Sequence, residues 1–294
     1  MILITTPTGQ IGRQVLDNIL DSAEAIRVIA RDPSRLAPRV RERVEVVPGS
    51  HNDPDVLTEA LAGADSVFWV VPPDPGATSV EGHCLSFTQP LCEAITSQGV
   101  QRVVGVSTLG RGVAKNAGQI SAALAMDELI EKTGVSYRAL EMPGFMENML
   151  RQIEPIKSQG AFFLPMSGDR RIPACATRDI AAVAAELLLD DSWSGQGGVP
   201  ILGPEDLSAD DMAQIMSEVL ERPVRFQQVP GEAYKATLMR HGMSEAWAQG
   251  MIDMTTEVDR GIYNTQPRTP QSTTPTSFRQ WCEDVLKPAF TQSS

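Results

Sequence analysis

The first half of the chain alternates short apolar runs with helix-like segments, and this alternation constrains the fold more than any other feature. Apolar runs that are separated by helices are typical of parallel strands covered on both faces. Because crossovers between parallel strands are right-handed, we predict an α/β fold with a doubly wound parallel Rossmann-like sheet. The six predicted strands are 2–5, 26–30, 44–47, 66–71, 101–106 and 135–140.

Charge and residue usage exclude several classes of function. The 294 residues include 25 Lys plus Arg and 37 Asp plus Glu, a net charge of −12. This acidity argues against nucleic-acid or anionic-membrane binding. The chain shows no signal-peptide pattern and no apolar run near a membrane span in length, so we expect a cytoplasmic protein. The four cysteines and three histidines lack metal-ligand spacing, and we expect no metal site.

The segment from Thr6 to Gly12 (TPTGQIG) lies between the first strand and the first helix. Gly9 would let the backbone approach a pyrophosphate, and Gly12 would let the helix pack close to the sheet. Thr6 occupies the place of the first glycine of the usual fingerprint, and we expect its side chain to point away from the phosphates. A plain strand-to-helix turn is the alternative, and the context favours a nucleotide loop.

The residues after the second strand indicate the cofactor. Arg31 lies where a guanidinium could hold a 2′-phosphate, and Arg35 is a second candidate. Asp32 could neutralise Arg31 or contact the ribose itself, and the arginines could also belong to a solvated face. Because the first residue past the strand is basic, we predict NADP(H) in preference to NAD(H).

Seven collinear segments of the chain resemble the NmrA-like family of atypical short-chain dehydrogenase/reductase relatives. They are TPTGQIGRQVLDNIL, the RDPSR junction, VFWVVPP, VVGVSTLG, YRALEMPGFMENML, TRDIAAVAAELL and ILGPEDLSADDMAQIMSEVL. The resemblance implies a Rossmann domain over residues 1–150, to which 175–203 return. It also implies a smaller α+β substrate domain, 151–174 and 204–294, with substrate bound between the two.

The same resemblance implies roles for individual residues. The cofactor-binding set is Thr6, Thr8, Gly9, Gln10, Ile11, Gly12, Arg31, Arg35, Asn52, Asp53, Val71, Pro72, Pro73, Ser107, Thr108, Pro143 and Phe145. Asn52 or Asp53 must serve near the adenine because Ser50 replaces the acid found there in the family. A second departure is Met142, which stands where the family has an arginine before the Pro-Gly pair.

The catalytic Tyr-x-x-x-Lys pair of ordinary short-chain dehydrogenases is absent. By spacing, it falls at Gln119 and Ala123, and neither can transfer protons at neutral pH. The remaining candidates for the proton donor are Ser107, which ends the fifth strand, and Lys115, in the following loop.

Two classes of function follow. The first is an NADP(H)-dependent reductase of a small conjugated or aromatic acceptor such as a quinone, enone or dye, since these accept hydride without a strong protein acid. Its substrate would contact Thr108, Phe145, Met146, Met239 and Trp247, the last two as an adaptable apolar lid or as ordinary packing. The second is a non-catalytic NADP-sensing protein with a regulatory protein partner, or a non-redox biosynthetic enzyme. The sequence leaves homo-oligomerisation open.

Overall fold

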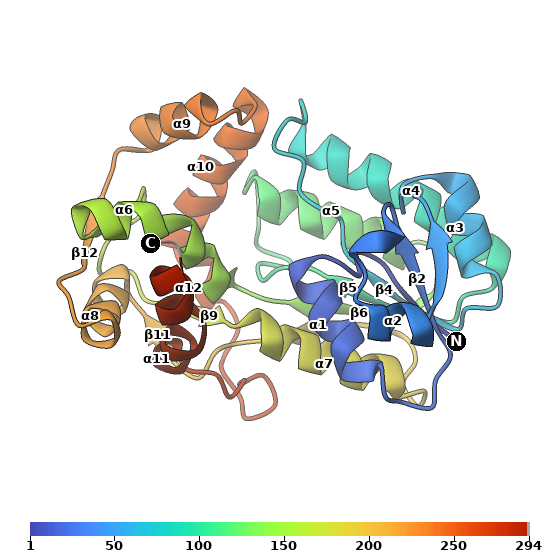
Figure 1. Cartoon of the computed structure of the whole chain (residues 1–294). Coiled ribbons are helices and arrows are strands. Elements are labelled where there is room, and N and C mark those ends of the chain that lie inside the picture. The colour runs from blue at the N-terminus through green and yellow to red at the C-terminus, as the bar shows by residue number, and fades with distance from the viewer. Residues whose placement is uncertain (293–294) are drawn as a thin grey trace.

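The computed structural model describes residues 1–292, and its centre is a seven-stranded, wholly parallel sheet (Figure 1). The strand order is β10-β6-β5-β4-β1-β2-β3, which reverses direction between β1 and β4. That order is the doubly wound Rossmann arrangement, so the predicted fold class is confirmed. The strands are β1 (Ile2–Ile4), β2 (Ile26–Ala30), β3 (Glu45–Pro48), β4 (Ser66–Trp69), β5 (Arg102–Val106), β6 (Ser136–Glu141) and β10 (Gln196–Pro200).

Helices cover both faces of this sheet. One face packs against α1 (Gln10–Ile19), α2 (Pro38–Arg43) and α7 (Thr177–Leu189), and the other against α3 (Pro54–Leu61), α4 (Val80–Gln98) and α5 (Gln119–Glu131) (Figure 1). Successive residues of β1 serve opposite faces: Leu3 belongs to the second core and Ile4 to the first. Both are fully buried because a central parallel strand has no solvent-facing side.

Two helical regions contain a helix-breaking residue. Pro90 does not divide its helix, because α4 runs through it unbroken and its side chains on either side, such as Phe87 and Leu91, are buried against the sheet. The methionine-rich region forms two helices, α9 (Gly231–Arg240) and α10 (Glu245–Asp259). Gly242, with φ of 91°, lies in the turn between them.

The remaining elements form a second part of the molecule. It has its own core, which includes Phe162, Met216, Phe278 and Trp281. One small sheet has the order β11-β9-β7 and another pairs β12 with β8. Sequence periodicity did not predict β8 or β9, which are only four residues long. The bounds are β7 (Gly144–Phe145), β8 (Ala161–Leu164), β9 (Ile172–Cys175), β11 (Asp206–Leu207), β12 (Arg225–Gln228), α6 (Ile153–Gln159), α8 (Ala209–Leu220), α11 (Phe278–Trp281) and α12 (Lys287–Gln292).

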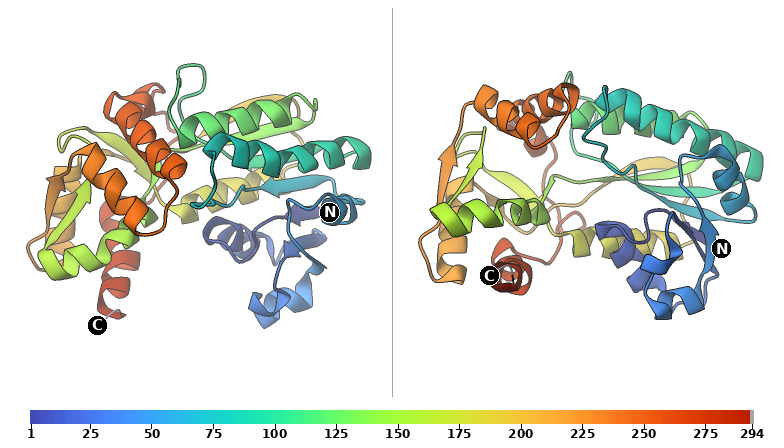
Figure 2. Two further views of the ribbon diagram at one scale, coloured as in Figure 1. Left: turned by 90° about the horizontal axis from the view of Figure 1, so that it is seen from above. Right: turned by 45° about the horizontal axis from the view of Figure 1, so that its top comes forward.

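The two parts touch along α10, which lies beside α5 (Figure 2). A Cβ on Gly118 would lie 2.0 Å from the carbonyl oxygen of Gly250, so the two backbones meet directly. Ser244, which caps α10, donates from its backbone N to Pro75 O at 2.8 Å and from its hydroxyl to Ala77 O at 2.6 Å. The second part is therefore anchored to the segment that follows β4. The domain boundaries given above stay a prediction.

Candidate functional site

The loop between β1 and α1 can be built only with glycine at its closest point. A Cβ on Gly12 would lie 2.3 Å from the backbone oxygen of Thr6, and one on Gly9 would lie 3.2 Å from the same atom. α1 begins after Gly9 without a side-chain cap. Its first backbone N–H groups and the positive end of its dipole are thus left for a ligand, which fits a pyrophosphate.

Thr6 differs from what the sequence led us to expect. Its φ is 51°, in the left-handed region that favours glycine and that a β-branched residue rarely adopts. Its hydroxyl oxygen would lie 2.8 Å from a Cβ on Gly12, so the side chain faces the first turn of α1 and does not point away from the loop. The replacement of the first glycine therefore costs backbone strain.

Hydrogen bonds bring the ends of four strands together, and Gly49 N donates to Ala30 O at 3.1 Å, which joins the segment after β3 to β2. The Thr5 hydroxyl donates to Phe68 O at 2.8 Å and accepts from Val70 N at 3.3 Å, which joins β1 to β4. His51 contacts Val70 O through Nε2 at 2.9 Å, which joins the segment after β3 to β4. The predicted residues Thr8, Gly9, Gln10, Arg31, Val71, Pro72 and Pro73 follow these strands and so share one edge of the sheet.

Arg31 is the exposed cation at the end of β2. It lies near enough to His51 to disfavour the imidazolium, and burial is the larger cause that lowers the pKa of His51 to about 4. Asp32 does not pair with Arg31, because its carboxylate caps the turn that follows and accepts from Ser34 N at 3.0 Å. At neutral pH, Arg31 is thus positively charged beside a neutral histidine. This setting suits a 2′-phosphate.

Arg35 and the two candidates for the adenine are less distinctive. Arg35 is exposed at the end of the turn Pro33–Arg35. Asp53 is the N-cap of α3, where its carboxylate accepts from Asp55 N at 2.9 Å, so that carboxylate already has a structural task. Asn52 is exposed, and within the described part of the chain its side chain makes no hydrogen bond, which makes it the stronger of that pair.

The residues expected near the nicotinamide are also neighbours. Ser107 N donates to Leu140 O at 3.0 Å and Leu109 N to Met142 O at 3.1 Å, so the chain after β5 stays paired with the chain after β6. Ser107 and Thr108 therefore lie beside Pro143. Phe145 follows in β7, where it pairs in register with Cys175.

A buried polar network lies beneath the end of β5. The Ser107 hydroxyl donates to Asp127 Oδ2 at 2.5 Å, and the Tyr137 hydroxyl donates to Asp127 Oδ1 at 2.6 Å. Arg111 donates to Asp127, Glu131 and Glu141, at 2.9 Å in each case. Asp127 is fully buried, and burial raises its pKa to about 6 although its donors oppose that shift.

The sequence analysis gave no role to Asp127, Arg111 or Tyr137. Tyr137 is fully buried, and its ring crosses Gly105 of β5, where a Cβ would lie 2.4 Å from the phenol oxygen. The one available signal was an acid at position 127 in the largely apolar stretch QISAALAMDELI. The network draws on segments up to 34 residues apart, from Ser107 to Glu141, so no local pattern reveals it.

The place of the absent catalytic tyrosine is covered by α10. Gln119 donates to Trp247 O at 3.3 Å, and a Cβ on Gly250 would lie 3.1 Å from the Gln119 amide oxygen. Lys115 is exposed on the preceding loop, and among residues 1–292 its ammonium group has no hydrogen-bond or ion-pair partner. Of the two predicted donors, Ser107 is the one whose side chain is held by a hydrogen bond in the described residues.

The predicted substrate residues are not brought together. Trp247 packs against Val80 and Ala122 of α4 and α5, which is the packing alternative rather than a lid. Met146 belongs to the core of the second part, and Met239 is 41% exposed on α9. Thr108 and Phe145 keep their place at the ends of β5 and β7.

Tyr263, which the sequence analysis did not identify, lies next to Thr108. It comes from the turn Ile262–Asn264, and it forms a hydrogen bond with the Thr108 side chain. Burial raises the pKa of Tyr263 to about 12, so the phenol stays protonated. A residue of the second part thus borders the end of β5.

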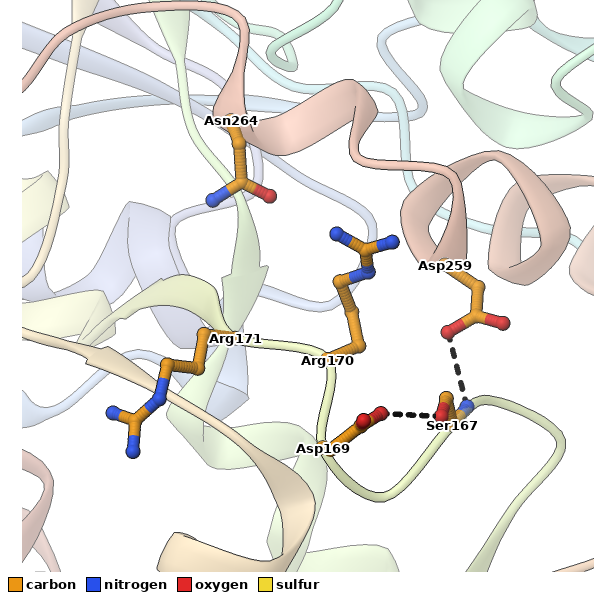
Figure 3. Close-up of a pocket in the computed structure, with 6 residues that line it drawn as sticks. All are labelled: Ser167, Asp169, Arg170, Arg171, Asp259 and Asn264. Atoms are coloured by element: carbon orange, nitrogen blue, oxygen red, sulfur yellow. Dashed lines mark hydrogen bonds between the residues drawn. The ribbon is translucent and has the colours of Figure 1, made fainter.

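A separate polar pocket of about 600 Å³ lies at the loop before β9 (Figure 3). Three of its lining residues bond to one another: Ser167 N donates to Asp259 at 3.0 Å and the Ser167 hydroxyl to Asp169 at 2.6 Å. None of the predicted site residues lines it. Its lining residues are Ser167, Asp169, Arg170, Arg171, Asp259 and Asn264.

Residues 1–292 contain neither a cluster of metal ligands nor a membrane-spanning helix. No group of three or more His, Cys, Asp and Glu side chains in that range could hold a metal ion. Within the same range, every helix is too short or too polar to cross a membrane.

The strand order, the glycine-only contact at Gly12 and the uncapped α1 define a protein of the Rossmann dinucleotide-binding class. The chain belongs to the NmrA-like family, whose model matches residues 1–274.

Three relatives illustrate the family. The chain is 30% identical to a (4-alkanoyl-5-oxo-2,5-dihydrofuran-3-yl)methyl phosphate reductase of Streptomyces griseus subsp. griseus, over 96% of each chain. It is 28% identical to an NAD(P)H azoreductase of Xenophilus azovorans, over 86% of each chain. An Escherichia coli NADPH-dependent quinone oxidoreductase complexed with NADPH has a similar structure, with a TM-score of 0.78 at 19% identity, covering 100% of this chain and 99% of that one.

Proposed function

We propose that the protein is an NADP(H)-dependent reductase of a small conjugated or aromatic acceptor, such as a quinone, an enone or an azo dye. The observation that carries the proposal is the edge where the glycine-only loop at Gly12 and the exposed cation Arg31 follow neighbouring strands. The S. griseus, X. azovorans and E. coli relatives are named as reductases or oxidoreductases, two of them of azo or quinone acceptors. Their names support the reaction class.

The chain's own residues would divide the work along the edge of the sheet. Gly9 to Gly12 would receive the pyrophosphate at the start of α1, and Arg31 would pair with the 2′-phosphate. Ser107, Thr108 and Pro143 would border the nicotinamide, which supplies a hydride when the cofactor is bound. Tyr263 would close this end of the site against water. Orientation and exclusion of water are what hydride transfer requires most.

A panel assay tests the proposal. We expect NADPH-dependent loss of the reduced-nicotinamide absorbance with at least one quinone, enone or azo dye, and a lower kcat/KM with NADH than with NADPH. Tight NADPH binding without turnover of any acceptor on the panel would contradict the reductase assignment.

The second function is an NADP-sensing protein, favoured by Gln119 and Ala123 at the place of the usual catalytic pair. A sensor would discriminate between the oxidised and reduced cofactor, show no turnover and bind a protein partner. Measurements of turnover and of cofactor binding on one protein preparation therefore distinguish the two functions. We place the protein in the cytoplasm, where its four unpaired cysteines stay reduced, and size-exclusion chromatography would decide whether it forms a homo-oligomer.

A further inference from the structure

The acceptors named above differ in whether they need a proton. A quinone or azo group that takes a hydride must also gain a proton on oxygen or nitrogen, and the usual phenol–lysine pair that would supply it is missing here. The end of β5 carries instead the buried network centred on Asp127. Because this network lies beside the predicted nicotinamide site, we examine it as a source of the proton.

We propose that Ser107 and Asp127 form a proton relay in which Ser107 gives its hydroxyl proton to the acceptor and Asp127 restores it. Ser107 is then the catalytic residue and Asp127 a positioning residue that acts through it. This inference rests on the proposed reductase function and extends it to acceptors that must be protonated.

The geometry suits a relay because the transfer distance is already short. Ser107 Oγ and Asp127 Oδ2 are 2.5 Å apart, and both side chains are nearly or fully buried. The Tyr137 phenol holds the other carboxylate oxygen at 2.6 Å, which fixes the orientation of Asp127. Since the chain after β5 pairs with the chain before Pro143, the Ser107 hydroxyl lies at the edge where the acceptor is expected.

The charges around Asp127 allow it to carry a proton near neutrality. Arg111 faces it from the segment after β5, Tyr137 from β6 and Glu131 from the next turn of α5. Arg111 is shared with Glu131 and Glu141, so one cation serves three carboxylates and cannot fully stabilise the charge on Asp127. Burial is the main reason that its pKa rises to about 6, and the Tyr137 phenol stays protonated because its own pKa is raised well above the ordinary value.

The step balances in atoms and charge. In the protonated state the Asp127 carboxyl donates to Ser107 Oγ, which frees the Ser107 hydrogen for the acceptor. As the acceptor gains a hydride from NADPH, carrying two electrons, its oxygen or nitrogen takes the Ser107 proton. The Asp127 proton restores the Ser107 hydroxyl, and the resulting carboxylate stays beside Arg111 until solvent returns a proton.

A pair of acceptors isolates this step. A quinone needs hydride and proton, whereas a cationic triarylmethane dye becomes neutral with hydride alone. We expect Ser107→Ala and Asp127→Asn each to lower the ratio of quinone rate to dye rate at least tenfold. Asp179→Asn removes another buried carboxylate, on α7 and hydrogen-bonded to Thr276, and should leave that ratio unchanged.

The pH dependence gives a second activity readout. The wild-type quinone rate should fall above pH 6 because the protonated fraction of Asp127 falls, while the dye rate should not follow it. Tyr137→Phe removes a hydrogen bond that lowers the pKa of Asp127, so the falling limb should move to higher pH. In Asp127→Asn the limb should disappear.

A readout without turnover completes the test. Carboxyl NMR of the free protein, labelled in its aspartates, should show Asp127 titrating near 6, and higher in Tyr137→Phe. An unchanged quinone-to-dye ratio in Ser107→Ala, or titration of Asp127 near the ordinary 3.8, would overturn the relay. A wild-type protein that reduces neither acceptor would overturn the reductase proposal and the relay with it.

Discussion

The loop at the start of α1 and the network at the end of β5 lie on the same edge of the sheet but are built in opposite ways. The loop acts through its backbone, and its requirement is the absence of a side chain at Gly12. The network acts through side chains, with Asp127 receiving three donors in the interior. Under the proposed function, the loop would bind the cofactor's diphosphate, whereas the network would take part in the reaction. Cofactor binding and chemistry would then depend on separate parts of the molecule.

Of the substitutions that test this comparison, Gly12→Ala should have the largest effect, and the effect is on cofactor binding. Its new Cβ would meet the Thr6 backbone oxygen at 2.3 Å, so α1 must move away from the sheet. We expect NADPH to bind about 100-fold more weakly, on the order of 3 kcal/mol. Calorimetric titration measures this, with Gly197→Ala as the control because its Cβ would have only Arg138 nearby, at 3.9 Å. Unaltered NADPH binding in Gly12→Ala would break the account of the loop.

The network should make the free energy of unfolding depend on pH. Asp127 has a pKa of about 6 in the folded protein and 3.8 as its ordinary value, so the folded state holds the proton more tightly. Its stabilising contribution is complete below pH 4 and is lost as the pH rises through 6, a change of about 3 kcal/mol. Urea unfolding should show that the wild type loses this free energy of unfolding between pH 4 and 7, whereas Asp127→Asn does not. A difference between the two proteins that does not vary with pH would contradict the shift.

Arg31→Ala should sharpen the binding side of the comparison. Removal of a charge-assisted contact to the 2′-phosphate should weaken NADPH about 10- to 30-fold and leave NADH nearly unchanged. Arg39→Ala is a matched control, since Arg39 pairs with Asp21 on the exposed surface. If both cofactors weakened equally, Arg31 would not be the residue that selects between them.

Thr6→Gly should have the smallest effect and the opposite sign. Glycine takes φ of 51° without a Cβ penalty, so the free energy of unfolding should rise by about 1 kcal/mol. Thermal or urea unfolding measures it. A loss of stability would mean that contacts of the Thr6 side chain outweigh the strain of its backbone.

The fold and the loop could be predicted because their determinants are local. Alternating apolar runs specify the parallel sheet, and residues 6–12 are contiguous, so their roles follow from one short pattern. Even there the prediction for the Thr6 side chain was wrong, because nothing in the sequence distinguishes a threonine with positive φ from any other threonine. Trp247 and Met239 were grouped by composition, yet the turn at Gly242 places one in an interface and the other at the surface.

The network could not be predicted because each of its members has an ordinary local setting. Asp127 sits at a helical spacing that also suits a solvated acid, and Arg111 follows a glycine in a loop. Only the packing of α5 over β5 and β6 brings Ser107, Asp127 and Tyr137 within hydrogen-bonding distance. Burial then changes the pKa of Asp127, which no sequence pattern encodes.

The most direct test of the central claim is transfer of label from NADPH deuterated at the nicotinamide C4 to a conjugated enone. The account predicts deuterium on the β-carbon of the reduced product, on one face only, because the acceptor is held in a single orientation at the ends of β5 and β7. NADPH that binds tightly yet passes no label to the enone, and is not oxidised by any quinone or dye, would contradict it.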